Sequence, residues 1–286
     1  MRVLVLSGGG SKGAFQVGVL QRLAKTEKLD YDGYCGISVG ALNGGFLAMY
    51  PTTIEAIEPL SQMWLGLETK DIHKRWFPFG KFHGLWKSSL YNSSPLRKTC
   101  ERLFNRDNII NNKKMLSVGA VSLTSGKYKY WTETDEDILE GILASSSFPV
   151  MFLPITKESE LWTDGGVRDV VPLKNAIEMG ATEIDVITCS YPGIFSTQKA
   201  KPNAVDVAIR SLEIMMDEVI HNDIHVADGY NKFIREMGAN YSGNKKVIKI
   251  RVFYPATPLD FDSLSFENKE ITQMIKIGND ASYYEV

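Results

Sequence analysis

Two glycine-rich turns near the N-terminus constrain the fold of this chain more than any other feature. The first covers residues 8–13 (GGGSKG) and follows an apolar run, and the second covers 36–40 (GISVG) and follows the strand-like segment 31–35. The residues after each turn, 14–24 and 41–50, carry the apolar spacing of helices. Strands that pass through tight turns into helices are typical of an α/β protein with a mainly parallel sheet covered on both faces.

The second turn places Ser38 at a strand-to-helix corner. Gly36 and Gly40 lack the Cβ atoms that would clash in so sharp a turn, so the serine hydroxyl can project towards a substrate. Pro51 is expected to end the helix that follows. The N-terminus of that helix also favours negative charge. The sequence therefore predicts Ser38 as a nucleophile.

The first turn contains three consecutive residues without side chains, Gly8, Gly9 and Gly10. Their backbone N–H groups can converge on one oxygen atom without steric obstruction, as an oxyanion hole requires. One such donor contributes roughly 3 kcal/mol to the stabilisation of a tetrahedral transition state. Lys12 either adds positive potential there or is a surface lysine at a helix start. The two turns together predict a serine acyl hydrolase.

The same glycines allow a second interpretation, a dinucleotide-binding fingerprint. Gly8, Gly10 and Gly13 satisfy G-x-G-x-x-G after a strand, and Asp30 or Asp32 lies near the place expected for a ribose-binding acid. This interpretation predicts a nucleotide-dependent oxidoreductase and leaves the serine turn without a task. The sequence contains no phosphate loop of the G-x-x-x-x-G-K-[ST] type.

A serine hydroxyl is a poor nucleophile at neutral pH and needs a base. Asp164, in the string WTDGGV, follows a short apolar run and precedes two glycines that let another backbone segment approach. An ordinary aspartate, with a pKa of about 3.9, is a weak base, so the site must desolvate it beside the hydroxyl. The alternative role for Asp164 is a turn-forming Asp-Gly pair.

The four histidines provide weaker alternatives for the base. His73 and His83 lie in an aromatic segment, while His221 and His225 are four residues apart on a predicted amphipathic helix. The order serine, aspartate, His221 formally suits a hydrolase triad, and the two helical histidines formally suit a metal pair. Histidines on a helix surface are the commoner case. We therefore expect neither a metal ion nor a cofactor.

The three motifs, together with segment 144–154 (ASSSFPVMFLP), resemble the patatin-like phospholipase family from residue 1 to about 189. The resemblance implies a three-layer α/β/α fold and a serine-aspartate dyad that hydrolyses acyl esters of glycerolipids, phospholipids among them, through an acyl-enzyme. By position, Ser38 would be the nucleophile, Asp164 the base and the glycine triplet the oxyanion donor. Ser7 stands where plant members often carry an acid, and we expect it to alter local hydrogen bonding rather than chemistry. A lipid-binding module with an inactive dyad is the alternative outside enzymes.

The composition fits one ordinary globular enzyme. The chain has 286 residues, of which 44% are hydrophobic and 23% charged, and its net charge of −2 gives no reason to expect nucleic-acid binding. The motifs are far apart in sequence and must meet in space. We therefore expect a single domain over 1–286, with its motifs within 1–189 and the segment 203–286 packed on it. Oligomeric state is not predicted.

The odd number of cysteines, Cys35, Cys100 and Cys189, favours a reduced, cytoplasmic setting. No segment approaches the ~20 apolar residues of a membrane span, so any membrane contact is expected to be peripheral. One segment, 70–87, is rich in aromatic and basic residues and is either a lipid-facing lid or a loop whose rings fill a satellite core. Its membrane-contact candidates are Trp76, Phe77, Phe79 and Trp86.

The rest of the chain also predicts alternating strands and helices. A hairpin is expected from 115–123 and 128–131, and strands over 183–189 and 246–254. Helices are expected over 138–145, 172–179 and 204–237, the last with possible breaks.

Overall fold

The computed structural model describes residues 1–77, 87–192, 203–237 and 247–286. These residues form a nine-stranded sheet with the order β5-β6-β3-β2-β1-β7-β8-β9, and β4 pairs with β3 outside this path. The parallel part consists of β1 (Arg2–Leu6), β2 (Gly33–Gly36), β3 (Met115–Ser122), β7 (Glu183–Ile187) and β8 (Lys249–Tyr254). The antiparallel neighbours are β4 (Tyr128–Thr132), β5 (Ile155–Lys157), β6 (Glu160–Asp164) and β9 (Ser282–Glu285).

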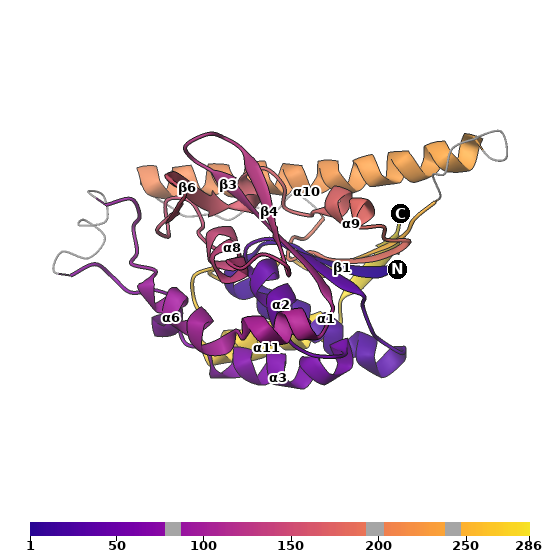
Figure 1. The fold of residues 1–286 in the computed structure, drawn as a ribbon, viewed down its shortest axis with the longest axis horizontal. Coiled ribbons are helices and arrows are strands. Elements are labelled where there is room, and N and C mark those ends of the chain that lie inside the picture. Colours follow the sequence, from indigo (N-terminus) through magenta and orange to yellow (C-terminus); the bar gives the residue numbers. More distant parts are fainter. Residues whose placement is uncertain (78–86, 193–202, 238–246) are drawn as a thin grey trace.

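Helices cover both faces of this sheet, as Figure 1 shows. On β1, Leu4 and Leu6 belong to one buried cluster and Val3 and Val5 to the other, because successive side chains of a strand point to opposite faces. The expected three-layer α/β/α arrangement is therefore confirmed. The helices that contribute buried side chains to the first cluster are α1 (Gly13–Thr26), α2 (Val39–Ala48), α3 (Thr53–Gly66), α6 (Ser94–Leu103), α7 (Arg106–Asn111), α8 (Ile138–Ser145) and α11 (Asn268–Asn279). Those that contribute to the second are α9 (Leu173–Glu178) and α10 (Ala204–Met237).

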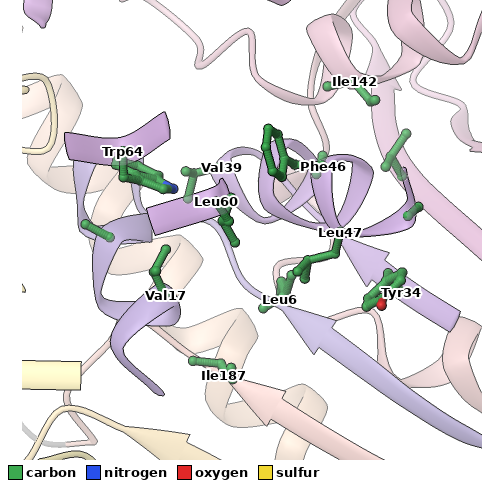
Figure 2. Close-up of a cluster of buried hydrophobic side chains, with 14 of the residues drawn as sticks. Leu6, Val17, Tyr34, Val39, Phe46, Leu47, Leu60, Trp64, Ile142 and Ile187 are labelled. Atoms are coloured by element: carbon green, nitrogen blue, oxygen red, sulfur yellow. The ribbon is translucent and has the colours of Figure 1, made fainter. Parts of the chain in front are cut away.

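The core between α2 and the sheet fixes the position of the second glycine turn. Figure 2 shows Phe46 and Leu47 of α2 above the strands that carry Leu6 and Tyr34, with Trp64 of α3 at the side. Burial of each large apolar side chain stabilises the fold by about 1.5–3 kcal/mol. This packing presses the N-terminal end of α2 against β1, so the corner between β2 and α2 has a defined place.

The structure confirms the strand-turn-helix units and the hairpin of β3 and β4, with ends that differ by a few residues. Two features differ from expectation. The helix over 204–237 has no break, because Gly229 lies on an exposed surface of α10 where nothing crowds it. The sheet also continues beyond β8 through β9, which pairs antiparallel to it and was not predicted.

The C-terminal region packs closely on the N-terminal region. Gly18 of α1 and Gly278 of α11 lie at the crossing of these helices, where an added Cβ on Gly18 would overlap the carbonyl of Ile275. Asn231 of α10 is fully buried and bonds the main chain of Ile248 in both directions, at 2.7 and 2.9 Å. Residues 247–286 thus belong to the same layers as the glycine turns.

Replacement of Gly18 by alanine is expected to destabilise the protein by about 1–3 kcal/mol, because its methyl group overpacks the crossing of α1 and α11. Gly229→Ala is the matched control: this helical glycine has open space around it. The control is expected to stabilise the protein by about 0.5–1 kcal/mol. Urea unfolding monitored by circular dichroism measures both changes, and a neutral Gly18→Ala would contradict the close packing.

Candidate active site

Ser38 lies at a strained corner between β2 and α2. Its backbone angles are φ 56° and ψ −126°, a region that residues with a side chain rarely occupy. The neighbouring glycines are needed here: an added Cβ on Gly36 would overlap the carbonyl of Gly40, and one on Gly40 would overlap the carbonyl of Leu6. The crowding expected from the sequence is confirmed.

The first glycine turn faces this serine. An added Cβ on Gly8 would lie 3.8 Å from Ser38 Oγ. Gly10 adopts a φ of 60°, which turns the chain into a short 3-10 helix. In the hydrogen bonds of the described residues, the backbone N–H groups of Gly8, Gly9 and Gly10 have no intramolecular acceptor. The structure therefore brings unused donors beside the serine.

Asp164 ends β6, which pairs with β3 so that Asp164 lies opposite Ala120. Its side chain is fully buried. Oδ1 accepts a hydrogen bond from the Gly166 N–H at 2.8 Å, while Oδ2 has no hydrogen-bond partner among the described residues. Burial raises the pKa of Asp164 to about 7, although the Ser38 hydroxyl and the Gly166 amide act to lower it.

Ser38 and Asp164 therefore face one another, but the hydrogen bond between them is not fully formed. The hydroxyl is close enough to lower the pKa of the carboxyl, whereas Oδ2 lacks a partner of normal distance and alignment. Hydrogen bonds of this kind are often long or misaligned without substrate and tighten once a complex forms. A serine hydroxyl beside a buried carboxyl is the arrangement that proton transfer between the two groups requires.

Residues 145–147, at the C-terminal end of α8, bond the backbone N–H groups of both Ser38 and Asp164. Ser145 Oγ accepts the Ser38 N–H at 3.0 Å, and the carbonyl of Ser147 accepts the Asp164 N–H at 3.1 Å. Ser146 Oγ donates to the carbonyls of Ile142 and Ser38, at 2.8 and 3.3 Å. The sequence indicates this segment only through the family resemblance and does not indicate its role. The available signal was the run of three serines at the end of an apolar helix, where hydroxyls bond back to the preceding turn.

Ser7 ties the first turn to β7, as expected for a role in local hydrogen bonding. Its hydroxyl donates to the carbonyl of Gly8 and accepts from the N–H of Cys189, both at 3.0 Å.

On the other side of the dyad, Met216 of α10 touches Gly166: an added Cβ on Gly166 would lie 2.5 Å from the methionine Cε. Ser38 itself is only 8% exposed.

The acids required by the dinucleotide interpretation lie elsewhere. Asp32 accepts the backbone N–H of Arg2 at 2.7 Å, so it lies where β1 begins, whereas the glycine turn lies where β1 ends. Asp30 accepts hydrogen bonds from the Thr53 main chain and from Lys114, at the same end of the sheet. A ribose-binding acid belongs at the carboxyl end of the strands. The structure thus does not support the alternative of an NAD-type oxidoreductase.

The histidines do not join the dyad in the described structure. His221 and His225 are exposed on α10, and His73 Nε2 bonds the carbonyl of Leu264 at 2.9 Å. His83 lies outside the described residues. Among the residues that are described, no group of three His, Cys, Asp or Glu side chains is placed to hold a metal ion.

The aromatic segment is described in part. Trp76 is half-buried and donates its indole N–H to the carbonyl of Ser89 at 3.1 Å, whereas Phe77 is 91% exposed. Phe79 and Trp86 lie outside the described residues. No helix in the described ranges is long and apolar enough to cross a bilayer.

Comparison with known proteins identifies the family of this chain. The model of the family described as patatin-like phospholipase matches residues 4–177, which include both glycine turns and Asp164. The match covers more than half of the chain. The protein therefore belongs to the patatin-like phospholipase family, a family of lipid hydrolases.

Individual relatives are distant. A cGAMP-activated phospholipase of Escherichia coli (strain TW11681) is 27% identical over 54% of this chain and 48% of its own length. The protein YjjU of Escherichia coli (strain K12) is 26% identical over 96% of this chain and 74% of its own. A probable lipid hydrolase, 463L, of Invertebrate iridescent virus 6 is 27% identical over 62% of this chain and 63% of its own. The chain spans about half the length of the cGAMP-activated phospholipases that it matches.

Asp164→Asn is expected to stabilise the protein at high pH and not at low pH. The folded-state pKa, about 7, lies above the ordinary 3.8, so the aspartate contributes most to stability when it is protonated, and this contribution is lost as pH rises through 7. The difference in unfolding free energy between variant and wild type should therefore grow from about pH 4 to about pH 8, by roughly 1.4 kcal/mol for each unit of pKa shift. Urea unfolding of both proteins across this range measures it. A difference that does not depend on pH would contradict the buried, unpaired carboxyl.

Proposed function

We propose that this protein is a lipid acyl hydrolase that cleaves fatty acyl esters of glycerolipids, phospholipids or lysophospholipids among them. Ser38 is the nucleophile, Asp164 the base, and the amides of Gly8, Gly9 and Gly10 bind the oxyanion. One observation carries the proposal: a buried carboxyl with a pKa near 7 faces a serine hydroxyl that lies near Gly8. Among the described residues, one oxygen of that carboxyl and the backbone N–H groups of the glycine triplet have no hydrogen-bond partner.

The chemistry follows from these positions. Asp164 removes the hydroxyl proton as Ser38 Oγ attacks the ester carbonyl, and the amides of the first turn stabilise the negative charge on the carbonyl oxygen. The intermediate collapses when Asp164 returns the proton to the departing alcohol, which leaves an acyl-serine. Asp164 then removes a proton from water, which attacks the acyl group, and returns that proton to Ser38 Oγ as the fatty acid leaves. A base with a pKa near 7 suits both transfers at neutral pH.

Family membership and the names of the relatives support a lipid substrate. The cGAMP-activated phospholipases match 54% and 58% of this chain, and the probable lipid hydrolase matches 62% of it. Since the chain spans about half of the former, a nucleotide-activated mode is not part of this proposal. Peripheral contact with a lipid surface through Phe77 belongs to it, because that ring is almost fully exposed.

Ser38→Ala and Asp164→Asn are each expected to abolish hydrolysis, with a loss in kcat of more than about 10³-fold. The assay is fatty acid release from mixed phospholipid vesicles, with folding checked by circular dichroism. Ser211→Ala is a matched control, since this exposed hydroxyl bonds only within α10 in the described structure. Activity that survives Ser38→Ala would overturn the mechanism.

The rate should rise with pH because the base must be deprotonated. With the pKa of Asp164 at about 7, kcat/KM is expected to increase tenfold per pH unit below 7 and to level off above it. A pH profile on a soluble acyl ester measures this directly. A midpoint near 4 would show an ordinary solvated carboxylate and would contradict the proposed base.

Phe77→Ser is expected to weaken binding to phospholipid vesicles without a change in unfolding free energy, because an exposed ring contributes little to the core. Co-sedimentation with vesicles and urea unfolding measure the two effects. Unchanged sedimentation would argue against membrane contact at this position. Hydrolysis of a soluble ester serves as the control, since it should not change.

A further inference from the structure

A C-terminal segment lies directly behind the first glycine turn. The carbonyl of Ser263 accepts the Ser11 N–H at 2.9 Å, and the carbonyl of Asp262 accepts the Ser11 hydroxyl at 3.0 Å. Gly10 approaches the same place so closely that an added Cβ would overlap the Ser263 carbonyl. Two adjacent carbonyls, about 250 residues away in sequence, therefore hold the N–H and the hydroxyl of Ser11, the residue that follows the triplet.

This segment is itself fixed to the helical layer. The N–H of Phe266 donates to Thr69 Oγ1 at 3.0 Å, and the ring of Phe266 stacks on Trp64 with centroids 6.1 Å apart. Asn268, at the start of α11, donates to the carbonyl of Leu65 at 2.7 Å. We call residues 262–268 the strap. Its carbonyls at 262 and 263 contact the first glycine turn, and its other end is anchored to the helical layer by Phe266 and Asn268.

The opposite side of the first glycine turn is fixed by Cys189, which lies just after β7. An added Cβ on Gly9 would lie 2.8 Å from the Cβ of Cys189, whose N–H bonds Ser7. The turn is therefore enclosed between Cys189 and the strap at 262–263. Neither contact uses the N–H groups of the triplet, which have no acceptor among the described residues.

We propose that Asp262 and Ser263 act through their carbonyls as positioning residues for the oxyanion donors, with Ser11 as the residue that receives this support. The inference rests on the proposed function. It extends the proposed active site beyond residue 177, where the family match ends. Stabilisation of an oxyanion depends on donors that are already oriented before the charge forms. A turn released from the strap would bind the substrate ground state about as well but the transition state less well.

Ser11→Ala tests this, because it removes one of the two hydrogen bonds to the strap and leaves Ser38 and Asp164 in place. In the full chain, we expect kcat on a soluble acyl ester to fall about tenfold, with KM little changed. The affinity for an alkyl trifluoromethyl ketone, which forms a tetrahedral adduct with the serine, should fall by the same factor. The midpoint of the pH profile should stay at the wild-type value. Thr272→Ala is the matched control: it removes the same kind of hydroxyl-to-carbonyl bond from α11, away from the turn, and should keep wild-type values.

Wild-type kcat and ketone affinity in Ser11→Ala would overturn the inference, and so would a fall in kcat without a parallel fall in ketone affinity. If Ser11→Ala does not fold, Asn268→Ala serves in its place, because this exposed residue anchors the far end of the strap. It should show a smaller parallel loss, and no loss would overturn the inference. A wild-type protein that neither hydrolyses esters nor binds the ketone would instead overturn the proposed function, on which the inference depends.

Discussion

Both residues of the proposed dyad depend on residues 145–147 at the C-terminal end of α8. Ser145 Oγ holds the N–H of Ser38, and the carbonyl of Ser147 holds the N–H of Asp164. Because α8 is anchored in the core through side chains such as Ile142 (Figure 2), the hydroxyl and the carboxyl are placed by a rigid helix end. Rigid placement matters for catalysis, since a misplacement of about 1 Å can cost a factor of about 10² in rate.

Two buried aspartates of the same sheet show what makes Asp164 different. Burial alone would raise the pKa of Asp185, but hydrogen bonds from Arg251 and Tyr31, with the charges of Arg251 and Arg2, lower it instead. In the described parts of the chain no cation acts on Asp164, so burial dominates and its pKa rises to about 7. The paired carboxylate stabilises the fold, whereas the unpaired one costs stability at neutral pH. Such a cost is typical of residues retained for function.

The sequence predicts those parts of the site that local geometry determines. A serine between two glycines at a strand-to-helix corner has one plausible conformation, and an aspartate before Gly165 and Gly166 stands out for similar reasons. The supports at Ser145, Ser147 and Ser263 could not be predicted in this way, because two of them act through backbone carbonyls, which every residue has. Their partners Asp164, Ser38 and Ser11 are also about 17 to 250 residues away in sequence. Only the packed fold shows which carbonyl meets which amide.

In the proposed mechanism, Ser38 carries the acyl group during the reaction. Acid quench of the wild type during turnover of a soluble acyl ester, followed by mass spectrometry, tests it most directly. After digestion with trypsin, we predict one added acyl mass on the peptide 29–70, which lies between the cleavage sites at Lys28 and Lys70. Fragmentation should assign this mass to Ser38. Asp164→Asn should slow its formation, and Ser38→Ala should lack it. An acyl mass on another residue, or hydrolysis with no acylated Ser38 at any time of quench, would contradict the account.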